Sequence, residues 1–185
     1  MECISDLRLT DGGNYDNLGL EPVWKAAKYI LVSDGGSTFD AEPDRSLIWR
    51  LSRYTDILNN QVSALRRRWL ISNFIEKVLE GTYWGFGSRV RSYEQDLNRG
   101  YPEQLVDDVI SEGRTDLDAF SEAEAAVLEN HGYMLADVAV NKHLPCLIAK
   151  PSAPLAVPHL EWMEEKKVKS SLRRSHKRIF PLGRW

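Results

Sequence analysis

Two aspartates of this 185-residue chain each precede a pair of glycines at the end of an apolar run. Asp11 follows residues 7–10, and Asp34 follows residues 29–33. A carboxylate at the carboxyl end of a strand projects into the crevice where open α/β sheets bind ligands. The glycines allow a substrate or another backbone to come close. Both carboxylates are therefore candidate general bases, and the alternative for each is an aspartate that bonds the backbone of its own turn.

The residues after Asp11 are those expected to hold its turn in place. Asp16 and Asn17 are good helix-capping residues, and an apolar segment follows them. We therefore expect four residues to support the turn: Gly12, Gly13, Asp16 and Asn17.

Apolar spacing predicts the elements that position these residues. Residues 7–10 and 29–33 are expected to be strands, with a helix over about 18–27 between them. The second run is continuously apolar, which is typical of a parallel strand that is covered on both faces. Strand, helix and strand in this order form a βαβ-like unit, so the sequence predicts an α/β fold.

The longest periodic signal predicts a helix over about residues 44–79. Seven apolar residues recur at steps of four, three, four, four, three and four: Leu47, Leu51, Tyr54, Leu58, Val62, Leu65 and Trp69. This spacing places one apolar stripe along a helix, with Arg66–Arg68 on its far side. The arginines are more typical of a solvated helix face than of a phosphate cradle. A bend is expected near Asn59 and Asn60.

The remaining elements are shorter. Residues 81–87 indicate an aromatic strand bracketed by glycines, and residues 102–111 indicate a short helix. Ser121 with Glu124 three residues later is a capping box, so another helix is expected from there to about residue 141.

The charge distribution divides the chain in two. Residues 161–185 hold eight Lys or Arg and three Glu, a net charge of +5, which leaves −8 of the total −3 for residues 1–160. We expect one domain over 1–160 and a basic tail over 161–185. The tail is either a solvated end or a segment that contacts anionic membranes peripherally. The acidic total argues against nucleic-acid binding.

The remaining residue types suggest no further chemistry. Cys3 and Cys146 make neither a disulfide framework nor a zinc site, and the four histidines lack metal-ligand spacing. We therefore expect no metal and no cofactor. The sequence contains no signal-peptide pattern and no apolar run long enough to span a bilayer, so a cytoplasmic location is expected, with any membrane contact peripheral.

Several blocks, in order, resemble the bacterial patatin-like phospholipase family. These are Asp11–Trp24, Leu31–Gly36, Asn60–Arg68 and Gly81–Gly85, followed by Gly132–Asp137. The resemblance covers about residues 7–140. It implies a patatin-like three-layer α/β/α sandwich with a mostly parallel sheet. It also implies lipid degradation by acyl-ester hydrolysis, with a serine–aspartate dyad in which Asp11 is the base. Asp34 lacks the family's following residues, so it is a possible second acid with a structural role favoured.

The family's nucleophile is missing from this sequence. The serine belongs to a Gly-x-Ser-x-Gly elbow that no segment of the chain contains, and the nearest match, Gly85–Arg89, lacks the closing glycine. The family's glycine-rich oxyanion loop is absent too. Both lie before the aspartate in the family, and here ten residues precede Asp11.

Three explanations fit a chain that lacks the nucleophile. It is one part of a split enzyme, the product of an interrupted reading frame, or a truncated domain kept for binding. We expect the first: Asp11 would act on an acyl-ester substrate with a partner chain that carries the serine. The alternative is a non-catalytic interaction or lipid-binding module derived from the patatin fold.

Overall fold

The computed structural model describes residues 12–36, 47–93, 99–115, 119–149 and 154–177. Within these ranges the chain is a mixed α/β structure, mainly helical, with a small sheet of two parallel strands. The α-helices are α1 (Gly13–Asp16), α2 (Leu20–Trp24), α3 (Leu47–Ile75), α4 (Glu103–Leu105), α5 (Glu122–His143) and α6 (Glu165–Leu172). A π-helical turn (Val106–Ile110) continues α4, and short 3₁₀ turns occupy Val90–Ser92, Pro145–Leu147 and Leu160–Trp162.

The sheet is built from β1 (Tyr29–Asp34) and β2 (Glu80–Gly85), and α3 lies between them in the chain. The register pairs Ile30 with Gly81 and Asp34 with Gly85. Because the strands are parallel, their carboxyl ends lie at the same edge of the sheet. Any side chain that follows either strand is therefore brought to that edge.

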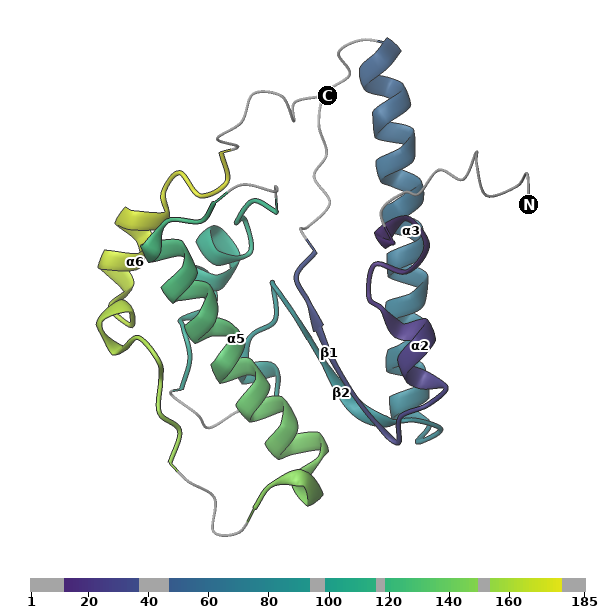
Figure 1. Cartoon of the computed structure of the whole chain (residues 1–185). Coiled ribbons are helices and arrows are strands. Elements are labelled where there is room, and N and C mark those ends of the chain that lie inside the picture. Colours follow the sequence, from purple (N-terminus) through teal and green to yellow (C-terminus); the bar gives the residue numbers. More distant parts are fainter. Residues whose placement is uncertain (1–11, 37–46, 94–98, 116–118, 150–153, 178–185) are drawn as a thin grey trace, which may run out of the picture.

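Helices lie on both sides of the two strands, with α2 and α3 on one side and α5 and α6 on the other (Figure 1). On the α3 side, Ile30 and Val32 pack with Leu70 in a small buried cluster that also contains Leu20. On the α5 side, Trp84 packs against a second, larger cluster. The strands therefore separate two hydrophobic clusters.

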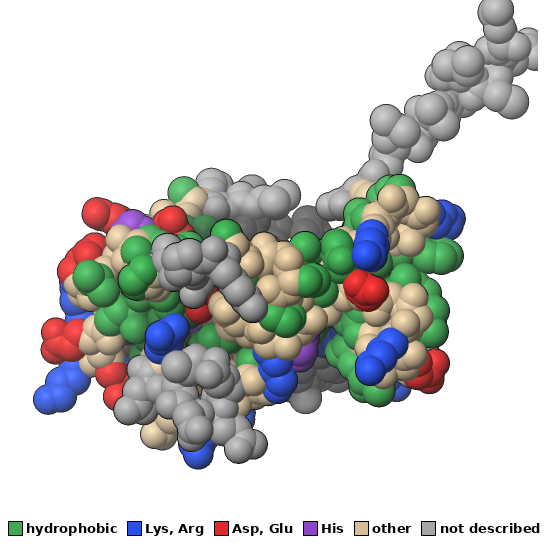
Figure 2. Space-filling view, turned by 90° about the horizontal axis from the view of Figure 1, so that it is seen from below, with side chains coloured by type: hydrophobic (Ala, Val, Ile, Leu, Met, Phe, Trp, Pro, Cys, Tyr) green, Lys and Arg blue, Asp and Glu red, His purple; other side chains and the backbone are tan. Residues whose placement is uncertain are grey.

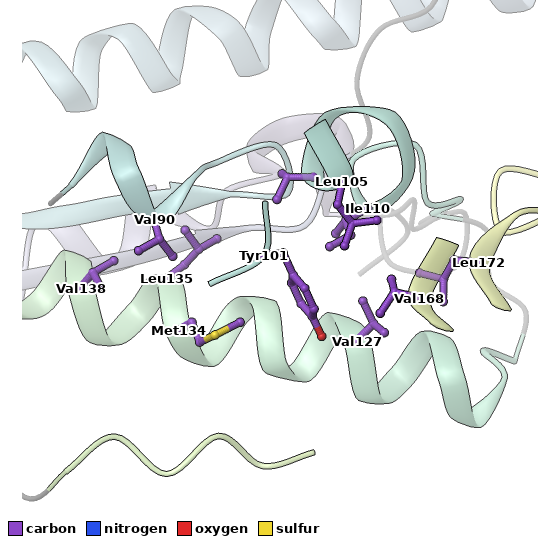
Figure 3. Close-up of a cluster of buried hydrophobic side chains, with 11 residues drawn as sticks. Val90, Tyr101, Leu105, Ile110, Val127, Met134, Leu135, Val138, Val168 and Leu172 are labelled. Atoms are coloured by element: carbon purple, nitrogen blue, oxygen red, sulfur yellow. The ribbon is translucent and has the colours of Figure 1, made fainter. Parts of the chain in front are cut away.

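The larger cluster joins α5, α6 and the segment around α4. Its buried members are Val90, Tyr101, Leu105, Val106, Ile110, Val127, Met134, Leu135, Val138, Val168 and Leu172. Figure 3 shows Val168 and Leu172 of α6 beside Val127 of α5. Part of the basic tail is therefore a helix packed in the core, and the expectation of a solvated end is wrong for these residues.

The predicted elements are largely found, with differences in length and burial. The strand over 81–87 is β2, and the capping box begins α5 as expected. The helix over 18–27 is only α2, and the long helix continues through Asn59 and Asn60 as one element. The predicted strand over 7–10 lies outside the described residues. None of the described helices is long and apolar enough to cross a membrane.

Two burial predictions are wrong. β1 is not covered on both faces, because Leu31 is 47% exposed and Ser33 is exposed as well. The arginines were expected on a solvated face of α3, but Arg66 and Arg67 are half-buried against the rest of the protein, and the apolar stripe is on the exposed side. A helical wheel shows that seven residues share a face, but only the neighbouring elements decide which face is covered.

Candidate functional site

Asp11, the predicted catalytic aspartate, lies outside the described residues. The structure describes the turn that follows it, beginning at Gly12. Gly12 opens the helical turn α1 through its carbonyl, which accepts hydrogen bonds from the N–H groups of Tyr15 and Asp16, both at 3.0 Å. Beyond the local chain, no atom lies within 4 Å of the position that a Cβ would take at Gly12. The backbone that directly follows Asp11 is therefore uncrowded.

Asp16 and Asn17 tie this turn to its surroundings. The N–H of Glu21 donates to Asp16 Oδ2 at 2.7 Å, so Asp16 caps the first turn of α2, although Gly19 occupies the N-cap position itself. Asn17 is the C-cap of α1. Its amide nitrogen lies 3.9 Å from the Cβ position at Gly36, which follows β1. The turn after Asp11 thus lies beside the carboxyl end of β1.

Arg66 of α3 holds the same turn from the helix side. It donates to the carbonyl oxygen of Tyr15 at 3.0 Å, and its guanidinium lies 5.3 Å from the centre of the Tyr15 ring. Its Nη1 lies 3.5 Å from Asp16 Oδ1, a buried oxygen that accepts no hydrogen bond from the described residues. The ion pair with Arg66 therefore offsets the desolvation of the Asp16 carboxylate.

Asp34 is held by three donors at the end of β1. Tyr83 Oη donates to Oδ2 at 2.7 Å and Arg67 Nη2 donates to the same oxygen at 2.9 Å. The N–H of Gly36 donates to Oδ1, also at 2.9 Å. Asp34 is only 7% exposed. A buried carboxylate with three donors is poorly placed to take a proton from an alcohol, which favours the structural role for Asp34.

Tyr83 completes this arrangement from β2. The register pairs Tyr83 with Val32, two residues before Asp34. Burial, and then the hydrogen bond to Asp34, raises the pKa of the Tyr83 hydroxyl well above its usual value. The phenol therefore remains a hydrogen-bond donor throughout the physiological pH range.

Two consecutive arginines of α3 each hold a different segment of the chain against that helix. Arg66 binds the turn over residues 12–19, and Arg67 binds the end of β1. We name this group of contacts the strand-end cluster: Tyr15, Asp16, Asp34, Arg66, Arg67 and Tyr83. It positions the backbone next to Asp11.

The sequence indicated only part of the strand-end cluster. Asp16 and Asp34 were singled out in the sequence, and both belong to this cluster. The arginines were assigned to a solvated face, and that interpretation is wrong for Arg66 and Arg67. Tyr15 and Tyr83 were not singled out. The sequence does contain a signal for such ion pairs. Two carboxylates lie beside predicted strand ends, and the helix that follows carries two consecutive arginines.

The described residues contain no group of three or more His, Cys, Asp or Glu side chains arranged to hold a metal ion. Comparison with known proteins identifies no relative, because no family model, curated protein or solved structure matches the chain.

Proposed function

We propose that this chain supplies the aspartate part of a patatin-like lipid acyl hydrolase, completed by a second polypeptide that carries the serine. In this mechanism the Asp11 carboxylate accepts the proton of the serine hydroxyl as its oxygen attacks the ester carbonyl carbon. The proton then passes to the departing alcohol, and water hydrolyses the acyl-enzyme with Asp11 again as the base. No metal or cofactor takes part.

One observation carries the proposal: the turn after Asp11 is fixed beside the carboxyl end of a parallel strand. Asn17 lies near Gly36, and Arg66 holds Tyr15 and Asp16 in place. Ligands of open α/β sheets bind at such an edge. The uncrowded backbone at Gly12 leaves room for a second chain to approach. The patatin-like three-layer sandwich is part of the same proposal, with the two described strands and the helices on both sides as its support.

The partner remains part of the proposal, and so does peripheral contact with anionic membrane through residues 161–185. The membrane contact is supported by three exposed basic residues, Lys166, Arg173 and Arg174. Trp162 supports it less, because Trp162 packs against the larger core cluster.

The experiment combines this chain with the polypeptide encoded immediately upstream and measures hydrolysis of a short-chain p-nitrophenyl ester. We expect activity only from the mixture. Asp11→Asn is expected to reduce it by about 10²- to 10⁴-fold, the usual contribution of a general base. Asp56→Asn is the matched control, because Asp56 is exposed on α3 and outside the strand-end cluster.

Equal activity of the Asp11→Asn and wild-type mixtures would contradict the catalytic role. A mixture that associates but never hydrolyses the ester would favour the alternative, a non-catalytic interaction module. The exposed apolar face of α3 is the observation that supports this alternative.

A further inference from the structure

The seven apolar residues that recur along α3 form a stripe on its solvent-facing side. We call these residues the α3 stripe: Leu47 70%, Leu51 59%, Tyr54 60%, Leu58 66%, Val62 42%, Leu65 59% and Trp69 41% exposed. Leu70, which packs toward the sheet, is fully buried. In Figure 1 the amino-terminal part of α3 extends beyond both strands. Figure 2 looks along α3 from below, and hydrophobic side chains lie at the outer surface of the part that contains α2 and α3. At one end of the stripe the Trp69 ring also contacts the Trp24 ring of α2, with the ring centres 5.5 Å apart. Solvent covers most of the remaining apolar surface of the stripe.

The α3 stripe is long and narrow. At about 100° per residue its members fall within an arc of about 80°, and 22 steps along the axis extend it to about 33 Å. Its spacing repeats every 11 residues, close enough to the helical period that the stripe stays on one side of a straight helix. Thr55 and Gln61 border its middle, and Ile57, which is 38% exposed, lies about 60° beyond the edge on the side of Gln61. A narrow seam of this kind is typical of helix–helix packing, whereas a helix that lies in a lipid surface has a broader apolar face.

The spacing is also symmetrical about its midpoint. Counting from Leu58, the other members lie four, seven and eleven residues away in both directions. An antiparallel copy of the helix therefore places apolar residues opposite apolar residues along the whole stripe. The pairs would be Leu58–Leu58, Tyr54–Val62, Leu51–Leu65 and Leu47–Trp69. Self-complementarity about a two-fold axis is the defining property of an isologous dimer interface.

The size of the surface suits a stable interface. From the exposed fractions, the α3 stripe presents apolar surface on the order of 800 Å², which matches the area that each partner buries in a standard interface. It exceeds the largest patch of a typical monomer, roughly 300–600 Å². The charged residue closest to the midpoint, Asp56, lies on the opposite side of the helix, so the proposed crossing point brings no like charges together.

We propose that two copies of this chain associate through an antiparallel α3–α3 pair, with the two-fold axis at Leu58. This interface is separate from the proposed acyl-hydrolase site, because the α3 stripe faces away from the sheet whose edge carries the strand-end cluster. The dimer does not depend on the proposed enzymatic activity.

The first test measures mass by light scattering during size-exclusion chromatography of the full chain at tens of micromolar. We expect twice the chain mass of 21.2 kDa for the wild type and the single-chain mass for Leu58→Glu. Leu58 is 66% exposed within one chain, so Leu58→Glu should retain its circular dichroism spectrum and melting profile. Asp56→Lys is the control that should remain dimeric. A monomeric wild type would overturn the proposal, and so would a dimer that Leu58→Glu leaves intact.

The second test determines the direction of the pair by crosslinking. In a background with Cys3→Ser and Cys146→Ser, a short bis-maleimide should link Leu58→Cys to itself. It should link Leu51→Cys to Leu65→Cys in a mixture, with neither variant linking efficiently alone. A parallel pair would instead link each variant to itself, and absence of any link would contradict contact through α3.

If the protein is monomeric and binds anionic vesicles in a manner that Leu58→Glu abolishes, the stripe is a membrane surface and the dimer is refuted.

Discussion

His131 is a buried imidazole that the hydrolase proposal does not use. Its Nε2 donates to the carbonyl oxygen of Phe86 at 3.2 Å, and its Nδ1 has no hydrogen-bond partner among the described residues. Burial lowers the pKa of His131 from 6.5 to about 4, against a smaller raising effect of the bond to Phe86. The side chain is therefore neutral at pH 7, and the native structure resists its protonation.

This pKa shift makes stability depend on pH. Between pH 6.5 and 4 the unfolded state binds the proton and the folded state does not, so the free energy of unfolding falls as the pH is lowered through this window. The full effect is on the order of 3 kcal/mol, at about 1.4 kcal/mol per pKa unit. His131→Gln should flatten this slope in urea unfolding at pH 7.5, 6 and 5. The exposed His176→Gln should leave it unchanged, and equal slopes for wild type and His131→Gln would contradict the assignment.

At the scale of elements, a strand and a helix come into close contact at Gly81 in β2. A Cβ at this position would lie 2.1 Å from the carbonyl oxygen of Ile30 and 2.6 Å from Phe74 Cε1. Glycine is therefore required where β1, β2 and α3 meet. The register that aligns Asp34 with Gly85 depends on this contact, and with it the shape of the strand-end cluster.

Gly81→Ala should consequently destabilise the protein by about 1–3 kcal/mol, the usual cost of excess volume in a packed core. Gly132→Ala provides a control of opposite sign, because Gly132 lies within α5 and its Cβ position has no neighbour within 4 Å. That substitution should stabilise the helix by up to about 1 kcal/mol. Chemical unfolding followed by circular dichroism measures both changes. A Gly81→Ala protein as stable as wild type would show that the sheet and α3 are less tightly packed than described.

At the scale of the whole molecule, a buried ion pair and its hydrogen bonds to Ser175 join the start of α5 to the segment after α6. Arg114 and Glu124 form the pair, and their side chains are 3% and 8% exposed. Glu124 also accepts from the hydroxyl groups of Ser121 at 2.8 Å and of Ser175 at 2.7 Å. Burial alone would raise the pKa of Glu124, but the hydrogen bonds, chiefly from Arg114, lower it to about 2. Because both members of the pair also bond Ser175, they hold the segment after α6 against the start of α5.

Glu124→Gln should destabilise the protein by about 3–5 kcal/mol at pH 7, because it breaks the buried ion pair with Arg114 by removing the charge of the carboxylate. Ser121→Ala, which removes only the capping hydroxyl, should cost about 1 kcal/mol. Since the pKa of Glu124 is lower in the folded state, its stabilising contribution is present above pH 4.5 and is lost as the pH falls toward 2. Urea titrations at pH 7 and pH 3 measure both effects. Equal losses for the two variants at pH 7 would contradict the role of the ion pair.

The sequence by itself determined the local elements: the strand before Asp34, the long helix through Leu58 and the capping box at Ser121. Each depends on spacing or on a hydrogen bond between near neighbours, which the order of residues specifies directly. It also specified that seven apolar residues share one side of α3. The role of Asp11 remains a proposal, drawn from the resemblance and from the turn that follows it.

Only the tertiary structure decided which faces are covered and which charges meet. Arg67 reaches Asp34 across 33 positions of sequence, and Tyr83 reaches it across 49. Such contacts depend on strand register and on the rotation of α3 about its axis, and amphipathic spacing sets neither. The spacing marks an apolar stripe without saying what covers it, and the seven residues of the stripe are 41% to 70% exposed in a single chain. The physical reason is that hydrophobic burial is non-directional: it requires a cover and leaves open whether that cover comes from the same chain or from another.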